Sequence, residues 1–366
     1  MSARIAAARR QARTARMAED QLDFVLVYGN AWQSDYLRYV TDFGILEGEA
    51  LALISRDGRV SLFVDSALEA ERARGETSDI ETSYSSAMLQ YVTARLESLS
   101  HFRIGYAPKR LMPQFVMARL DRAIADATPM LDRLLMVKLD CEIEAIRSAT
   151  HLADEGYAVF RNAARQGRKD YELVAEAEAF FRSRGVDDNF MIVGAGGTEV
   201  RGMSPPMGKV LKSGDLVTTE LTPCVDGYYI QICRTLVLGE PSAAQQNAFA
   251  VFRTALEAGI AAVKSGATAA DVARAENEIF RAHDLGDYVT DAYTRVRGHG
   301  LGLFVDTKPH ILENVTTVIE PNMTMIVHPN TYHPEVGYLV LGDAVIAGPV
   351  GAEVLTRTPR ELFVNP

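Results

Sequence analysis

Short apolar segments alternate with amphipathic ones over residues 22 to 130. The apolar segments are "DFVLVYG", the two arms of "EALALISRDGRVSLFV", which turn at Asp57-Gly58, and "RIGYA". Apolar residues recur at helical spacing near 66–74 and near 112–126. Strands of this length between helices predict a small α/β domain. The Arg-rich opening also has helical spacing, and we interpret it as a surface helix of that domain rather than a transit peptide.

A long amphipathic helix is predicted after this domain, in "CEIEAIRSATHLADEGYAVFRNAARQG". Its residues Ile143, Ile146, Thr150 and Ala153 fall on one face at steps of three and four. We expect the helix to join and brace two domains, which we place at 1–135 and 136–366.

Capping signals predict three more helices in the second domain. Asp170 precedes "YELVAEAEAFFRSRG", while Ser242 with Gln245 and Thr268 with Asp271 form capping-box patterns. Two strand pairs accompany these helices, "DLVTTELTPCVDGYYIQICRTLVLG" and "MTMIVHPNTYHPEVGYLVLGD" with its continuation "DAVIAGPVGAEVLT". Each pair has an apolar strand that ends in a polar residue, then a turn, then Gly-Tyr at the start of the return strand.

Composition narrows the class of partner. The 366 residues are 48% hydrophobic and carry a net charge of −10, which argues against nucleic acid and anionic membranes and favours a small-molecule substrate. Cys141, Cys224 and Cys233 show neither metal-ligand spacing nor a disulfide framework, and no apolar run reaches membrane-spanning length. We therefore expect a cytoplasmic protein.

Two segments have residues suited to catalysis. In "GHGLGLFVDTKP" glycines flank His299 and leave room for a ligand beside the imidazole. Glu220 ends the apolar strand "LVTTEL", and Gln231 lies eleven positions later on the return arm, where antiparallel pairing can bring both to one face. A buried acid needs a partner or a chemical role.

The order of these motifs resembles a known family. "VLKSGDLVTTELTPCVDGYYIQICRT", "GHGLGL", "IEPNMTMIVHPNTY" and "GYLVLGDAVI" follow one another as in the creatinase/aminopeptidase P group, the M24 peptidase family. The resemblance implies an α+β fold: a pita-bread catalytic domain after a smaller creatinase-like N-terminal α/β domain. It covers nearly the whole chain.

The same resemblance implies that the metal site is altered. Peptidases of this family bind two metal ions through two Asp, one His and two Glu. The matching positions here are Glu220, Gln231, His299, His328 and Gly342. Because Gln231 and Gly342 replace bridging acids, we predict that no metal pair and no cofactor is bound.

Three interpretations of the site follow. The first is a metal-independent hydrolase of a C–N bond in a small amidino, cyclic amidine or amide compound. It would use Glu220, His299 and His328 as catalytic residues, in a pattern similar to creatinase and ectoine hydrolase. An imidazole beside a carboxylate there should titrate near neutral pH. The second is a mononuclear-metal, Xaa-Pro peptidase-like hydrolase or a lyase using the same three residues. The third is a non-catalytic protein.

Further residues are predicted to contact substrate because they lie in or near these motifs. They are Arg201, Met203, Tyr228, Gln231, Asp306, Tyr332 and His333. Arg201 can pair with a substrate carboxylate. The resemblance also implies a homodimer, in which Trp32, Tyr36 and Tyr39 would supply aromatic walls to the partner's pocket.

Overall fold

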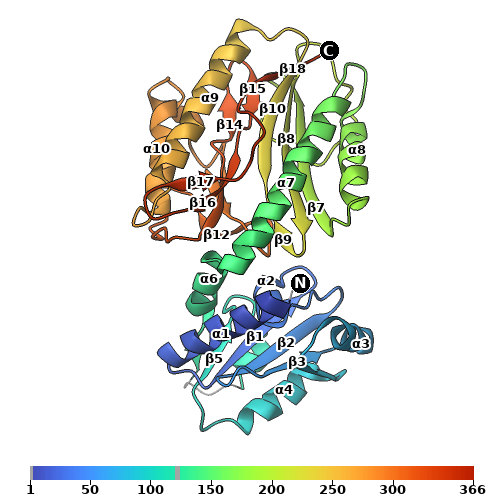
Figure 1. Ribbon diagram of the computed structural model, residues 1–366, viewed down its shortest axis with the longest axis vertical. Helices are drawn as coiled ribbons and strands as arrows, with labels where there is room; N and C mark the ends of the chain where they lie inside the picture. Colours follow the sequence, from blue (N-terminus) through green and yellow to red (C-terminus); the bar gives the residue numbers. More distant parts are fainter. Residues whose placement is uncertain (1–2, 120–123) are drawn as a thin grey trace. The chain divides into compact units, whose positions relative to one another are not determined.

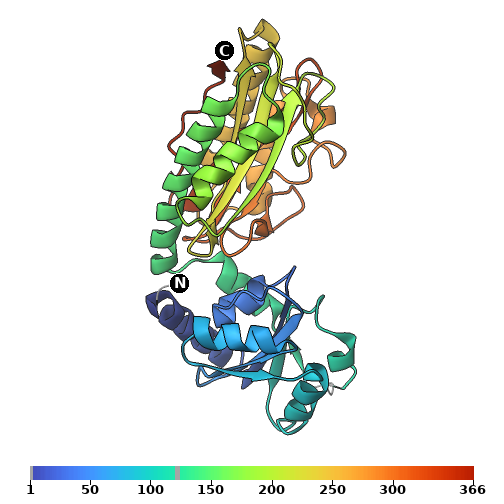
Figure 2. The ribbon, with the colours of Figure 1, turned by 90° about the vertical axis from the view of Figure 1, so that its right-hand side faces the viewer.

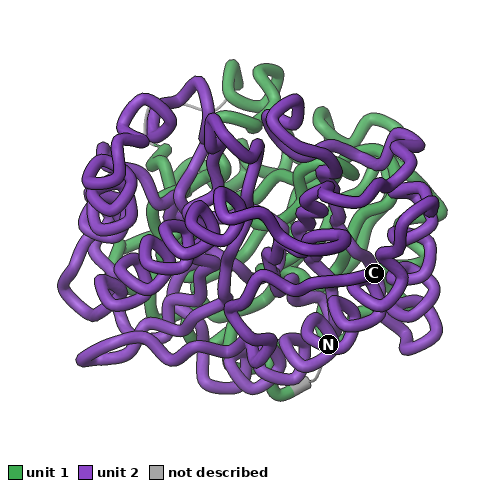
Figure 3. Tube along the Cα trace, turned by 90° about the horizontal axis from the view of Figure 1, so that it is seen from above, with its two compact units in different colours: residues 1–135 green, residues 136–366 purple. Residues whose placement is uncertain are grey.

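A computed structural model describes residues 3–119 and 124–366. The chain forms two compact units, residues 1–135 and 136–366, which Figure 3 colours separately. None of the described helices is both long enough and apolar enough to cross a membrane.

The first unit is a mixed six-stranded sheet with flanking helices (Figure 1). Its strand order is β4-β3-β2-β1-β5-β6; β1–β2 and β2–β3 pair antiparallel, and β3–β4, β1–β5 and β5–β6 pair parallel. The strands are β1 Phe24–Asn30, β2 Glu49–Ser55, β3 Val60–Val64, β4 Ile80–Tyr84, β5 Ile104–Ala107 and β6 Ala125–Asp126. The helices are α1 Ala3–Glu19, α2 Asp35–Thr41, α3 Ala67–Glu76, α4 Met88–Glu97, α5 Gln114–Met117 and α6 Thr128–Met136.

One prediction for this unit is wrong. The helix expected near 112–126 is reduced to the single turn α5, because Ala125 and Asp126 pair with β5 as the edge strand β6. Residues 120–123 of that predicted helix lie outside the described part of the chain. The Arg-rich opening forms α1, as predicted, and its buried Arg13 donates to the carbonyl of Val40 at the end of α2.

The second unit contains two five-stranded sheets, ordered β18-β10-β8-β7 with β9 on β8, and β12-β11-β13-β16-β17; β14 and β15 pair separately. The first sheet and that pair comprise β7 Asp188–Gly196, β8 Leu216–Val225, β9 Tyr228–Tyr229, β10 Ile232–Leu238, β14 Thr331–His333, β15 Gly337–Leu339 and β18 Phe363–Asn365. The second sheet comprises β11 Gly298–Gly300, β12 Thr307–His310, β13 Thr324–Val327, β16 Asp343–Ala347 and β17 Ala352–Val354.

Helices cover these sheets in two pairs. They are α7 Asp140–Ala163 with α8 Asp170–Arg182, and α9 Ala243–Ala262 with α10 Ala269–Arg281. Figures 1 and 2 show α7 and α8 packed on β7 and β8, while α9 packs on α10 and β13. Two of the three predicted caps are present, since Ser242 accepts from the Gln245 amide at 3.1 Å and Thr268 from the Asp271 amide at 3.2 Å. Asp170 is instead the first residue of α8, whose N-cap is Lys169.

A single β-bridge joins the two sheets. The amides of Cys233, on β10, and Gly342, just before β16, donate to each other's carbonyls at 3.2 and 3.0 Å. The bridge holds the Glu220 hairpin of the first sheet against β13, which ends just before His328, and β16, which begins at Asp343. Residues far apart in the sequence therefore share one wall.

Candidate active site

A pocket of about 380 Å³ lies where β7, β8 and β11 meet the loop of residues 291–296. It is lined by Ile192, Arg201, Gly202, Met203, Glu220, Asp291, Ala292, Tyr293, Thr294, Arg295, Val296, His299, His328, Asn330 and Tyr338. The three predicted catalytic residues are thus brought together, with two of the predicted substrate residues, Arg201 and Met203.

Glu220 and Asp291 are the acids that line this pocket, and Glu220 is the less exposed of the two. The strand β8 pairs it with Ile192 on one side and Cys233 on the other, and its Oε1 accepts a hydrogen bond from Asn330 Nδ2 at 2.8 Å. Burial raises the pKa of Glu220 to about 7, although the Asn330 hydrogen bond favours the charged form. Both protonation states are therefore populated at neutral pH, as proton transfer requires.

His299 and His328 lie edge to face, with ring centroids 5.4 Å apart. His299 Nδ1–H donates to the Gly300 carbonyl at 2.9 Å, which leaves Nε2 as an acceptor, while His328 Nδ1 has no hydrogen-bond partner among the described residues. Burial lowers the pKa of His299, and lowers that of His328 to about 3. Both rings are neutral at pH 7, so the expectation that an imidazole titrates there is wrong. The carboxyl group does so instead.

Gly342 has no room for a side chain. A Cβ atom there would lie 2.7 Å from the Cβ of His328, 3.0 Å from the Val327 carbonyl oxygen and 3.2 Å from the Cβ of Cys233. Gly342 and His328 therefore pack closely together, because the His328 side chain fills the space that a side chain at position 342 would need.

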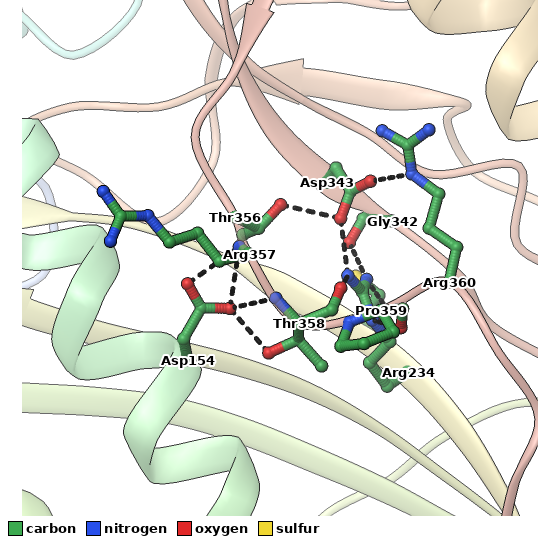
Figure 4. Close-up of polar contacts among 10 residues, drawn as sticks. Asp154, Arg234, Gly342, Asp343, Thr356, Arg357, Thr358, Pro359 and Arg360 are labelled. Carbon is green, nitrogen blue, oxygen red and sulfur yellow. Dashed lines mark hydrogen bonds and ion pairs between the residues drawn. The ribbon is translucent and has the colours of Figure 1, made fainter.

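The wall behind Gly342 is held by a buried arginine, shown in Figure 4. Arg234 Nη1 donates to the carbonyls of Cys233 and Gly342 at 2.9 and 2.7 Å, and Nη2 donates to Asp343 Oδ1 at 2.7 Å. Nη2 and Nε also donate to the carbonyls of Thr358 and Pro359 in the C-terminal segment. A fully bonded, buried guanidinium fixes the position of the bridge between the sheets.

That C-terminal segment is tied down from two sides (Figure 4). Asp154, on α7, accepts from the amides of Arg357 and Thr358 and from the Thr358 hydroxyl. Asp343, which is almost fully buried, accepts from Thr356 at 2.7 Å and from Arg360 as well as from Arg234. The segment thus closes the back of the candidate site.

The other predicted substrate residues do not line the pocket. Tyr228 donates to Glu142 at 2.9 Å inside the unit, the Gln231 amide lies 3.4 Å from Cys233 Sγ, and His333 accepts from the Glu335 amide. The guanidinium of Arg201 lies over the ring of Tyr332, 5.1 Å from the ring centroid. Of these four residues, Tyr332 contacts the pocket lining, through Arg201 and Tyr293.

Asp306 also lies behind the pocket, 4.0 Å from His299 Nδ1. It accepts from His310 Nε2 at 2.9 Å and pairs with Arg295. Burial opposes ionisation, but these partners outweigh it and keep the pKa of Asp306 well below its usual range. His310 thus helps to hold the carboxylate that lies 4.0 Å from His299 Nδ1.

Sequence reasoning missed Asn330 and the loop of residues 291–295. Asn330 bonds Glu220 through Nδ2, and its Oδ1 accepts from the Leu341 amide at 3.1 Å. Its place two residues after His328, in "VHPN", was the available signal. The loop has no motif, and only the folded chain shows that Tyr293 and Arg295 enter the pocket.

The side chains present do not fit a pair of divalent ions. Gln231 is buried against a thiol, Gly342 offers no ligand, and the described residues contain no cluster of three or more His, Cys, Asp or Glu arranged to hold a metal. This geometry also disfavours a single metal on Glu220, His299 and His328.

Comparison with known proteins defines the class. The chain belongs to metallopeptidase family M24, which matches residues 144–349. The creatinase/prolidase N-terminal domain matches residues 9–137, and together these matches confirm the predicted fold class.

Particular relatives are named as peptidases. The uncharacterized peptidase YqhT of Bacillus subtilis is 27% identical over 90% of this chain and 93% of its own. The Xaa-Pro dipeptidase of Pyrococcus furiosus is 28% identical over 63% of this chain and 66% of its own. The solved X-Pro aminopeptidase of Thermotoga maritima has a TM-score of 0.85 at 21% identity, covering 97% of this chain and 99% of that one. These names give no support to the predicted likeness to creatinase-type members, and they favour the peptidase alternative.

Proposed function

We propose that this protein hydrolyses a C–N bond in a small carboxylated substrate, with Glu220 as the general base and without a metal pair. The observation that carries the proposal is a carboxyl group with a pKa of about 7 that lines the same pocket as two neutral imidazoles, where the side chains do not fit two ions. Such a pKa suits a group that must both take and return a proton.

In this mechanism the Glu220 carboxylate removes a proton from water as the water oxygen bonds to the substrate carbon. Protonated Glu220 then gives that proton to the leaving nitrogen as the C–N bond breaks. Asn330 orients the carboxylate, and the unprotonated His299 Nε2 accepts a hydrogen bond from the attacking water or the substrate. Arg201, held over the Tyr332 ring, is the cation at the rim that pairs with the substrate carboxylate.

A second candidate is hydrolysis of Xaa-Pro dipeptides, which the names of the relatives favour. Both candidates are C–N hydrolases, so one substrate panel separates them. It contains Xaa-Pro dipeptides, N-acyl amino acids and carboxylated amidines, each assayed after chelation and with Mn²⁺, Co²⁺ or Zn²⁺ added back.

Our proposal expects the protein to hydrolyse a compound without proline, at a rate that chelation does not change. Glu220→Gln should reduce that turnover by about a hundredfold or more, and the exposed Glu257→Gln is its matched control. Metal-dependent cleavage of Xaa-Pro dipeptides alone would establish the second candidate. Binding of the panel compounds without turnover would favour the non-catalytic alternative. The predicted homodimer is tested separately, by light scattering.

A further inference from the structure

A second cavity, of about 470 Å³, lies in the same unit on the other side of the loop of residues 291–295. Asp291, Thr294 and Arg295 line both this cavity and the candidate active site. The remaining walls come from α10, from Val289 and Arg297, and from residues 312–314. The cavity therefore adjoins the candidate site without containing any of its three proposed catalytic residues.

Three arginines line this cavity, and one of them, Arg297, has nitrogens without hydrogen-bond partners among the described residues. It is 1% exposed, and its Nη1 donates to the Asn330 carbonyl at 3.2 Å. Its Nε and Nη2 have no hydrogen-bond partner among the described residues. By contrast Arg281 is paired with Glu313, and Arg295 with Asp306. A buried donor left without a partner is costly, and a charged one more so.

A buried acceptor in the same wall is also incomplete. Asn277, 5% exposed, donates through Nδ2 to Glu313 at 2.6 Å, but its Oδ1 has no partner among the described residues. Two residues that line the cavity thus have buried polar atoms without partners among the described residues, a cationic donor edge on Arg297 and a neutral acceptor on Asn277.

Glu276 is the rival partner for Arg297. It is fully buried on α10, yet neither of its carboxyl oxygens accepts a hydrogen bond from a described residue. Burial raises the pKa of Glu276 well above its usual range, against the attraction of Arg297, which favours the neutral acid. Arg297 itself stays charged at neutral pH, because burial lowers its pKa only to about 10. A neutral Glu276 does not balance that charge.

We propose that this cavity binds a small carboxylate that also carries a hydrogen-bond donor, such as a hydroxy acid or an amino acid. The free Nε and Nη2 lie on one edge of the guanidinium, where two parallel N–H bonds match the two oxygens of a carboxylate. The hydroxyl or ammonium group of the ligand donates to Asn277 Oδ1. Arg297 Nε and Nη2 and Asn277 Oδ1 are all covered in this structure, so binding requires both side chains to turn toward the cavity. The proposal is independent of the function proposed above.

The test is a calorimetric titration of the full chain with acetate and with glycolate, at ionic strength held constant with chloride. Both anions should bind saturably, and glycolate more tightly because of its hydroxyl group. Arg297→Met should weaken both by at least about tenfold, whereas the exposed Arg253→Met, the matched control, should leave both unchanged.

If Arg297→Met does not fold, Asn277→Leu provides the second test. It should reduce the affinity for glycolate to that for acetate and leave acetate binding intact. The proposal is overturned if the wild type shows no saturable binding, or if either variant fails to weaken binding as described. Equally tight binding of inorganic phosphate would overturn the assignment to carboxylates.

Discussion

Replacing Glu220 by Gln should change how the stability of the protein depends on pH. The pKa of this carboxyl group is about 7 in the folded chain, against an ordinary value of 4.5. Glutamine keeps the shape of the side chain but stays neutral at every pH. The two pKa values are about 2.5 apart, and each pH unit corresponds to about 1.4 kcal/mol, so about 3 kcal/mol is at stake.

The sign follows from which state holds the proton. Between pH 4.5 and 7 the folded protein keeps the Glu220 proton and the unfolded chain has lost it, so raising the pH favours unfolding. Relative to Glu220→Gln, the wild type should lose about 1.4 kcal/mol of unfolding free energy per pH unit over this window. The difference should be constant below about pH 4 and above about pH 8.

Urea unfolding followed by circular dichroism from pH 4 to 9 measures both proteins on the same scale. The exposed Glu257→Gln gives the background for losing one acid. A flat difference curve for Glu220→Gln would refute the reasoning, because it would mean that Glu220 titrates alike in the folded and unfolded chains. The reasoning would also be refuted if the midpoint of this difference curve lay near pH 4.5.

Three further substitutions test the surrounding wall. Gly342→Ala should cost about 1–3 kcal/mol of unfolding free energy in urea, because its methyl group meets packed atoms; Gly351→Ala, with open space around it, should be nearly neutral. Arg234→Met should cost about 3–5 kcal/mol by the same assay, since it leaves a buried carboxylate short of a partner. Asn330→Leu should raise the pKa of Glu220 by about 1–2 above its present value, because the hydrogen bond to the carboxylate is lost. The midpoint of the curve of stability against pH should then move to higher pH. An unchanged midpoint would contradict the role of Asn330 in stabilising the charged form.

Local patterns in the sequence were sufficient for much of the fold. Ser242 and Thr268 begin helices because their hydroxyl groups bind amides three residues later, a rule that acts within one turn. The segment 112–126 was mispredicted because pairing with β5, which is distant in sequence, decided the state of Ala125. Non-local pairing overrides a weak local preference.

The sequence predicted which residues form the candidate site better than it predicted their chemical properties. Motif order was enough to group Glu220, His299 and His328, which line one pocket. Whether the pKa of each group is raised or lowered was not predictable, because the shift depends on desolvation by residues from several strands. The fit between Gly342 and His328 was likewise hidden, since it is a matter of a few tenths of an ångström.

The Arg234 network has a consequence for biosynthesis. Apart from Cys233, the partners of this arginine lie 108 to 125 positions later in the chain. At about 5–20 residues per second, a ribosome needs roughly 5–25 s to supply them after β10 has been made. Until then the guanidinium must remain hydrated, so the second unit cannot complete its core while it is being translated. Chaperones that shield nascent chains should therefore engage this unit longer than the first.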